Sequence, residues 1–188
     1  MTTTLVLGGA RSGKSAFAEQ LAAQSGREVV YIATARSGDG EMAARIALHR
    51  RQRPAHWITV EEPVRLADAI TRHGGKERVI LVECLTLWLS NLLFADGCEY
   101  PEVGAVVLPA VLAEQRSALL AALASVPGDV ILVSNEVGMG IVPMGAVTRA
   151  YVDEAGRLNQ AVAAVCDRAV FIAAGLPLTL KDIPCSPA

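Results

Sequence analysis

The segment GGARSGKS, Gly8 to Ser15, has the residue types and the spacing of a loop that holds phosphate groups. It matches the P-loop pattern G-x-x-x-x-G-K-[ST] completely, and it lies between an apolar run and a helical pattern. The glycines let the backbone turn tightly and direct its N–H groups inward, and the following helix start adds a positive dipole end. We expect Lys14 to meet the β- and γ-phosphates of a nucleotide and Ser15 to ligate Mg²⁺. The alternative is a glycine-rich turn that binds nothing, and the pattern specifies neither the nucleotide nor the reaction.

A P-loop site also needs a carboxylate on a neighbouring strand to hold Mg²⁺ through water, and the segment VILVECLT supplies Glu83. Glu83 directly follows four apolar residues, so we expect it at the carboxyl end of a strand, the edge where such sheets bind ligands. A glutamate that merely faces solvent is the alternative. A second polar strand end, Asn135-Glu136, precedes Gly138 and Gly140 and is consistent with an active-site loop or with a plain loop.

The segment DGEMAARIALHRRQRPAHW places one histidine among arginines on an expected helix. Arg45 and His49 are four residues apart and therefore share a helix face. Further arginines follow until Pro54 ends the helix. Such a cluster suits an anion, and the neighbouring positive charge favours a neutral, nucleophilic imidazole that can attack phosphorus. From composition alone, however, a solvated basic helix end with His49 incidental is the favoured interpretation.

Short β-rich runs alternate with longer helical patterns, and these elements must position the residues above. Several runs are apolar throughout, as strands are when a parallel sheet is buried on both faces. The alternation therefore predicts an α/β fold of three layers, with a mostly parallel sheet flanked by helices. The expected strands are 4–7, 29–33, 57–60, 79–82, 130–134 and 169–173, and the expected helices are 14–24, 41–51, 64–73, 108–125 and 148–165.

The remaining segments and the length fit a single domain. Residues 96–104 are expected to form a surface excursion, and residues 176–188, with three prolines, an extended tail. A chain of 188 residues suits one α/β domain, and we expect residues 1–188 to form a single nucleotide-binding catalytic domain. Trp57, Trp88 and Phe94 are expected in its core, although aromatic rings of this kind can also stack on a large ring system.

Composition argues against several other classes of protein. A hydrophobic content of 52% and a charged content of 19% argue against disorder, and a net charge of −2 argues against nucleic acid or an anionic membrane as the main partner. We expect neither a signal peptide nor a membrane span, since the longest apolar stretch, 79–95, contains Glu83 and is short. The four cysteines form no C-x-x-C pair, so reduced thiols in the cytoplasm are expected.

Seven motifs together resemble one family, the bifunctional adenosylcobinamide kinase/adenosylcobinamide-phosphate guanylyltransferases of cobalamin biosynthesis. The resemblance covers residues 5–172, and the Arg-x-x-x-His helix and the SNEVGMGIVP loop are more specific to the family than the P-loop is. The motifs are GGARSGKS (8–15), YIATA (31–35), DGEMAARIALHRRQRPAHW (39–57), VEE (60–62), LVECLT (81–86), SNEVGMGIVP (134–143) and DEAGRLNQ (153–160).

The resemblance implies a P-loop, RecA-like fold and two reactions. Adenosylcobinamide is first phosphorylated by ATP or GTP, and GMP then passes from GTP to adenosylcobinamide phosphate, with release of pyrophosphate. The second reaction of the family passes through a guanylylated histidine that falls on His49, which overrides the interpretation from composition. The implied catalytic residues are His49 and Lys14, and the implied Mg²⁺ ligands are Ser15 and Glu83. The implied nucleotide contacts are Gly8, Gly9, Ala10, Arg11, Ser12, Gly13, Lys14, Ser15, Ala33, Thr34, Ala35, Arg50, Arg51, Gln52, Arg53, Glu61 and Glu83.

This chain departs from the family pattern in the helix that carries His49, and three alternative functions remain possible. Some members carry two adjacent histidines in this helix, whereas this chain has Leu48-His49, and His49 aligns with the reactive one by its distance to RPAHW. The family also implies a homo-oligomer, a trimer. The alternatives are a monofunctional guanylyltransferase, a simple P-loop small-molecule kinase in which His49 is dispensable, and a nucleotide-binding regulatory protein.

Overall fold

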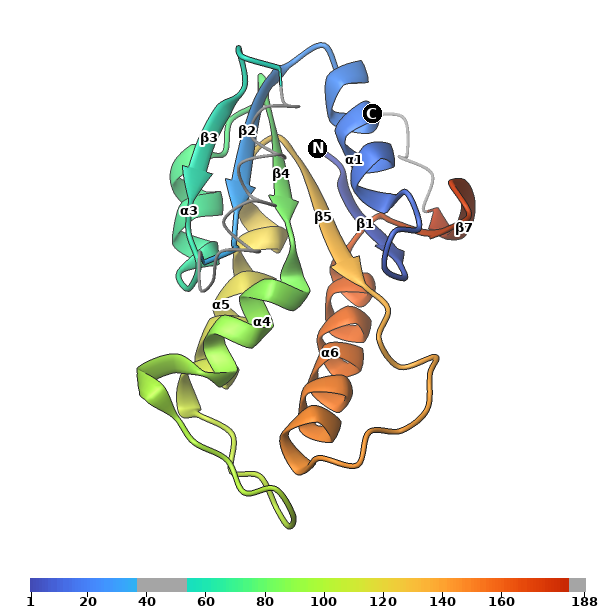
Figure 1. The fold of residues 1–188 in the computed structure, drawn as a ribbon. Coiled ribbons are helices and arrows are strands. Elements are labelled where there is room, and N and C mark those ends of the chain that lie inside the picture. The colour runs from blue at the N-terminus through green and yellow to red at the C-terminus, as the bar shows by residue number, and fades with distance from the viewer. Residues whose placement is uncertain (37–53, 183–188) are drawn as a thin grey trace.

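A seven-stranded sheet forms the centre of the molecule in the computed structural model, which describes residues 1–36 and 54–182 (Figure 1). The strand order is β3-β2-β4-β5-β1-β6-β7, and every neighbouring pair is parallel except β6 and β7, which are antiparallel. The strands are β1 (Thr3–Gly8), β2 (Glu28–Ala33), β3 (Ile58–Glu61), β4 (Arg78–Glu83), β5 (Asp129–Asn135), β6 (Arg168–Ala173) and β7 (Leu176–Asp182). The fold is thus the expected α/β architecture.

Helices cover both faces of this sheet, because the strands alternate apolar side chains toward two cores. In β1, Leu5 and Leu7 lie in one core, whereas Val6 lies in the other. Helices α3, α4, α5 and α6 pack on the first face, and in the described part of the chain α1 packs on the second. The helices are α1 (Lys14–Gln24), α3 (Leu66–His73), α4 (Leu85–Leu93), α5 (Ala110–Ser125) and α6 (Ala146–Val165), with a short 3-10 helix η1 (Ala95–Gly97).

Parallel pairing brings the carboxyl ends of the strands to one edge of the sheet. Ala33 of β2 pairs with Glu61 of β3 on one side and with Glu83 of β4 on the other. Gly8 of β1 pairs with Asn135 of β5. The polar strand ends singled out in the sequence therefore meet where α/β sheets bind ligands.

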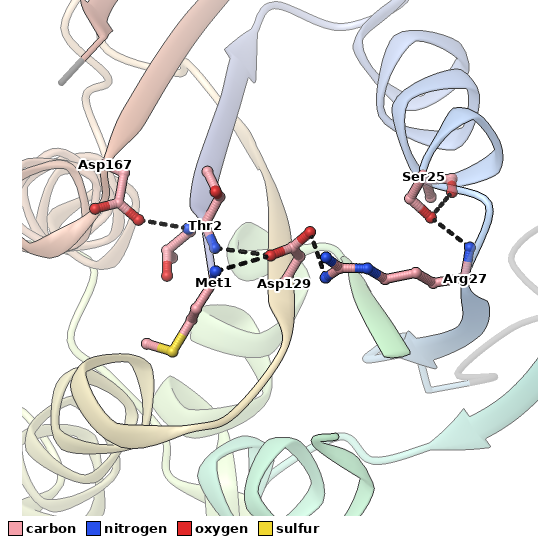
Figure 2. A network of polar contacts seen from close by, with 8 residues as sticks. Met1, Thr2, Ser25, Arg27, Asp129 and Asp167 are labelled. Atoms are coloured by element: carbon pink, nitrogen blue, oxygen red, sulfur yellow. Dashed lines mark hydrogen bonds and ion pairs between the residues drawn. The ribbon is translucent and has the colours of Figure 1, made fainter. Parts of the chain in front are cut away.

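At the opposite edge of the sheet, where the strands begin, carboxylates bind the start of the chain through hydrogen bonds and an ion pair. Asp129 at the start of β5 accepts a hydrogen bond from the Thr2 N–H at 2.8 Å and pairs with Arg27 at 2.8 Å (Figure 2). Asp167 accepts a hydrogen bond from the Thr3 N–H at 2.7 Å. These carboxylates tie the starts of β1, β5 and β6 together, so the edge opposite the site is fixed.

Most expected elements are confirmed to within two residues, and the expected helix 41–51 lies outside the described residues. Two elements differ from the prediction. The expected tail from residue 176 is wrong for Leu176–Asp182, which forms the edge strand β7. Helix α4 was not expected, because its run LTLWLSNLL is short and almost entirely apolar, and such a run does not by itself distinguish a helix from a buried strand.

The aromatic side chains follow the expectation in two cases of three. Trp57 and Trp88 are buried in the cores, and Trp88 donates a hydrogen bond from its indole N–H to the Val64 carbonyl at 2.8 Å. Phe94 is half exposed and packs edge-on against Tyr100, so its expected place in the core is wrong. Among the described residues, no helix is long and apolar enough to span a membrane.

Candidate active site

The loop 8–15 has the backbone of a phosphate-binding P-loop between β1 and α1. A Cβ at Gly8 would lie 2.5 Å from the Ser12 Oγ and 2.6 Å from the Ile172 carbonyl oxygen, so only glycine fits there. Gly13 has a φ of 97° and Arg11 a φ of 56°, which curls the chain into a concave turn. The Ser12 Oγ is buried and has no hydrogen-bond partner among the described residues, so its hydroxyl is available to donate to a ligand.

Two side chains of α1 carry the chemistry that the motif predicts. The Lys14 side chain is buried, and its ammonium donates to the Gly9 carbonyl at 3.2 Å, which holds the charge over the loop. The Ser15 hydroxyl donates to the Glu83 carboxylate at 2.8 Å, although the two residues are 68 positions apart in the sequence. A hydroxyl beside a carboxylate at a strand end is a donor set that fits Mg²⁺, so the residues present fit the metal that the motif implies.

A buried hydroxyl holds the chain around Glu83. The Thr34 hydroxyl, fully buried after β2, lies 3.1 Å from the Glu83 carbonyl oxygen and 2.8 Å from that of Cys84, and it accepts the Cys84 N–H at 2.8 Å. The Thr34 N–H donates to the Glu83 carbonyl at 3.0 Å. The Asn91 amide donates to the Thr34 carbonyl at 2.7 Å. These contacts hold the backbone at Glu83 and Cys84 against the end of β2.

A second set of polar contacts links β5 to α4 and α6. The Asn135 amide donates to the Thr86 hydroxyl at 2.6 Å, and the Tyr151 hydroxyl donates to the Thr86 carbonyl at 3.1 Å. Burial raises the pKa of Tyr151 to about 12, and burial followed by the charge of Glu83 raises the pKa of the Cys84 thiol. Both groups therefore stay neutral at the edge of the site.

The residue after Asn135 faces the P-loop directly. The Glu136 N–H donates to the Gly8 carbonyl at 3.0 Å, which places the start of the following loop beside the phosphate-binding turn. The Glu136 carboxylate accepts the Gly138 N–H at 2.6 Å and so shapes the turn after β5. The sequence left open whether this segment is an active-site loop or a plain loop. In the structure, the start of the loop adjoins the candidate site.

The structure gathers the sequence-predicted site residues that it describes at this edge. The P-loop residues Gly8, Gly9, Ala10, Arg11, Ser12, Gly13, Lys14 and Ser15 form the turn, and Ala33, Thr34, Ala35, Glu61 and Glu83 stand at or just after the ends of β2, β3 and β4. The predicted residues His49, Arg50, Arg51, Gln52 and Arg53 lie outside the described residues.

Three polar residues of the site were missed in the sequence, namely Thr86, Asn91 and Tyr151. Thr86 stands three residues after Glu83, so its nearness to the strand end was a usable signal. Asn91 and Tyr151 belong to helices whose approach to β2 and α4 is set by packing, and no local pattern indicates it.

The class that this fold and this loop define is the P-loop nucleotide-binding α/β proteins. Solved structures with a similar fold include an ATPase from the type III secretion system of pathogenic bacteria, with a TM-score of 0.52 and 12% identity, covering 95% of this chain and 56% of that one. Another is the ATPase EscN from the enteropathogenic E. coli type III secretion system, with a TM-score of 0.54 and 14% identity, covering 92% of this chain and 43% of that one. This chain spans about half the length of those structures, and the likeness concerns the fold alone.

Comparison of sequences gives the family. The model of the family described as cobinamide kinase / cobinamide phosphate guanyltransferase matches residues 4–180, and the chain belongs to this family of enzymes. The bifunctional adenosylcobalamin biosynthesis protein CobP of Pseudomonas aeruginosa is 54% identical over 96% of this chain and 98% of its own length. The bifunctional adenosylcobalamin biosynthesis protein CobU of Salmonella typhimurium is 44% identical over 94% of this chain and 98% of its own length.

Proposed function

We propose that this chain phosphorylates adenosylcobinamide with ATP or GTP and then transfers GMP from GTP to the phosphate so formed, yielding adenosylcobinamide-GDP and pyrophosphate. The observation that carries the proposal is the Ser15–Glu83 contact of 2.8 Å beside a complete P-loop, in a chain that matches the kinase/guanyltransferase family over residues 4–180. A P-loop with its acidic partner in place is the machinery of phosphoryl transfer.

In the kinase step, a hydroxyl of adenosylcobinamide attacks the γ-phosphorus, the nucleoside diphosphate leaves, and the hydroxyl proton is released. Catalysis is mainly positioning and charge stabilisation. The loop N–H groups and the Lys14 ammonium would bind the phosphates, and the Ser12 hydroxyl would donate to a phosphate oxygen. Mg²⁺ held by Ser15 and Glu83 would neutralise phosphate charge, and Thr34 would keep Glu83 in place.

In the guanylyl step, the His49 imidazole attacks the α-phosphorus of GTP, and pyrophosphate leaves. A phosphate oxygen of adenosylcobinamide phosphate then attacks the phosphorus of guanylyl-His49, which frees the imidazole. Arg50, Arg51 and Arg53 would balance the phosphate charge. This step rests on the sequence motif, because its residues lie outside the described ones.

The experiment is covalent labelling. The protein is incubated with Mg²⁺ and GTP labelled at the α-phosphate, denatured and examined for bound label, with His49→Ala beside it. We expect acid-labile, base-stable label on the unaltered protein and none on the variant. A folded protein that binds GTP but takes no label would remove the covalent step and leave a simple kinase or a nucleotide switch.

A direct assay of adenosylcobinamide phosphorylation tests the remaining alternative, a monofunctional guanylyltransferase. Label without phosphorylation of adenosylcobinamide would indicate a monofunctional guanylyltransferase.

The proposal also includes a cytoplasmic homo-oligomer, a trimer by family, that uses no nucleic-acid partner. The three cysteines in the described part of the chain, Cys84, Cys98 and Cys166, are free thiols, in keeping with a reducing compartment. Sedimentation of the purified protein tests the trimer.

A further inference from the structure

Large apolar side chains stand in solvent on the loop between β5 and α6. Met139, Ile141, Val142 and Met144 are between 72% and 98% exposed. Val137, at the start of the same loop, packs partly against the core. Water is a poor environment for so many neighbouring apolar groups, and a contiguous exposed patch marks a surface that another molecule covers. We call residues 137–144 the apolar loop.

Hydrogen bonds fasten the apolar loop at both ends. At its start, Glu136 is bonded to the P-loop through the Gly8 carbonyl. At its end, the Arg149 guanidinium donates to the Pro143 carbonyl at 3.2 Å and also to the Met144 carbonyl. The Ala146 N–H donates to the Glu102 carbonyl at 3.0 Å. The exposed side chains are therefore presented by a loop with fixed ends, which lowers the entropic cost of binding a partner.

The apolar loop lies between two features that limit what can cover it. On one side is the phosphate-binding turn at the carboxyl edge of the sheet (Figure 1). On the other side is a polar cleft of about 260 Å³ between residues 104–108 and α6, and Arg149, Asp153 and Arg157 contribute to its lining. Arg149 lines the cleft and is bonded to the end of the apolar loop, so the cleft adjoins the loop at that end.

From this surface we infer that the apolar loop holds the corrin macrocycle of the phosphate acceptor during transfer. The inference rests on the proposed function, since it assigns the substrate surface of the same site. A corrin ring has methyl-rich faces and amide-bearing arms, and its reacting hydroxyl stands at the end of one long arm. With that hydroxyl at the γ-phosphate, the ring lies outside the P-loop, next to the apolar loop, and its amides meet the charged cleft.

The test compares apolar-loop variants with a matched control in the kinase assay, using the full-length protein and adenosylcobinamide. Ile141→Ser and Met144→Ser each remove one exposed apolar side chain from the loop, and Leu180→Ser removes another, 57% exposed, from the edge strand β7. We expect each loop variant to raise the KM for adenosylcobinamide about tenfold while the KM for ATP stays within about twofold. The control should leave both values unchanged.

Each other result has a definite meaning. An unchanged KM for adenosylcobinamide in both loop variants overturns the inference while the proposed function stands. No phosphorylation of adenosylcobinamide by the unaltered protein overturns the proposed function, and the inference with it. If the loop variants instead reduce the molecular mass measured by light scattering, the loop is an interface with a second copy of the chain, and the inference is wrong.

Discussion

At the scale of single residues, Lys14 is the cation on which both proposed reactions depend. Its side chain is buried, and its ammonium is held by the Gly9 carbonyl at 3.2 Å, in the place where nucleotide phosphates would bind. We expect Lys14→Ala to lower the rates of phosphorylation and of guanylyl transfer more than about a hundredfold each. Steady-state assays of both reactions measure this, with the exposed Lys76→Ala as control. Full kinase activity in Lys14→Ala would contradict a shared site.

The Thr34 hydroxyl holds the backbone at Glu83 and Cys84. Thr34→Val keeps the shape of the side chain but leaves the buried Cys84 N–H without its acceptor. We expect the free energy of unfolding to fall by about 1–3 kcal/mol, and kcat to fall because Glu83 loses its backbone support. Urea unfolding measures the first effect. Thr71→Val, which removes a hydroxyl bonded to the Ala67 carbonyl within α3, should cost much less, and equal losses would contradict the assignment.

The two kinds of site residue differ in how far the sequence could reveal them. Lys14 and Ser15 follow from a local pattern, since one turn and one helix start suffice to place them. Glu83 follows from the general rule that polar residues at strand ends line the site. The positioning role of Thr34 depends on a contact with a residue 50 positions away, and no local pattern encodes a contact of that kind.

At the scale of elements, the P-loop turn shows which glycine the fold requires. Gly8→Ala would place a Cβ against the Ile172 carbonyl at 2.6 Å, and a backbone oxygen within β6 cannot move aside. A Cβ at Gly9 meets nothing within 4 Å. We therefore expect Gly8→Ala to lower the melting temperature of the nucleotide-free protein by several degrees, about 1–3 kcal/mol of strain, while Gly9→Ala leaves it nearly unchanged. Equal melting temperatures in calorimetry would show that the turn adapts.

Two elements could not be predicted because tertiary context overrides their local signals. Strand β7 contains Pro177, which favoured a tail, yet β7 is an edge strand with one unpaired side, where proline is tolerated. Helix α4 is buried against α5, α6 and β5 on most of its surface, so its apolar residues do not form one stripe. Elements with strong local signals were predicted closely, such as β1 from its apolar run and α1 from the P-loop pattern that precedes it.

At the scale of the whole molecule, the amino and carboxyl edges of the sheet differ in how their polar groups are bonded. Asp129 and Asp167 fix the amino edge through the first residues of the chain, whereas at the carboxyl edge the buried Ser12 hydroxyl has no hydrogen-bond partner within the described part of the chain. Helix α6 joins the two ends: its first turn lies beside the apolar loop, and Cys166 follows its last residue. Groups buried along α6 therefore report on the packing of the whole domain.

Titration of two of these groups predicts how the stability of the whole domain depends on pH. Burial raises the pKa of Cys166 from 9.0 to about 12 and that of Tyr151 from 10.0 to about 12. The unfolded chain loses the Cys166 proton above pH 9 and the Tyr151 proton above pH 10, while the folded chain keeps both. The stability that these groups contribute is therefore full below pH 9 and is lost as pH rises toward 12. Each group adds a slope of about 1.4 kcal/mol per pH unit inside its window.

Urea unfolding between pH 8 and pH 11 measures how the free energy of unfolding depends on pH. Each variant lacks one titrating group and keeps all the others, so its difference from the unaltered protein isolates the contribution of that group. In Cys166→Ser the free energy of unfolding should start lower, since a buried thiol is replaced, but should fall less steeply above pH 9 than in the unaltered protein. Tyr151→Phe should flatten the curve above pH 10 in the same way. Cys98→Ser, at an exposed position, should keep the full slope. Parallel curves for all four proteins would mean that α6 opens to solvent before the domain unfolds, so that its buried groups titrate in the native state.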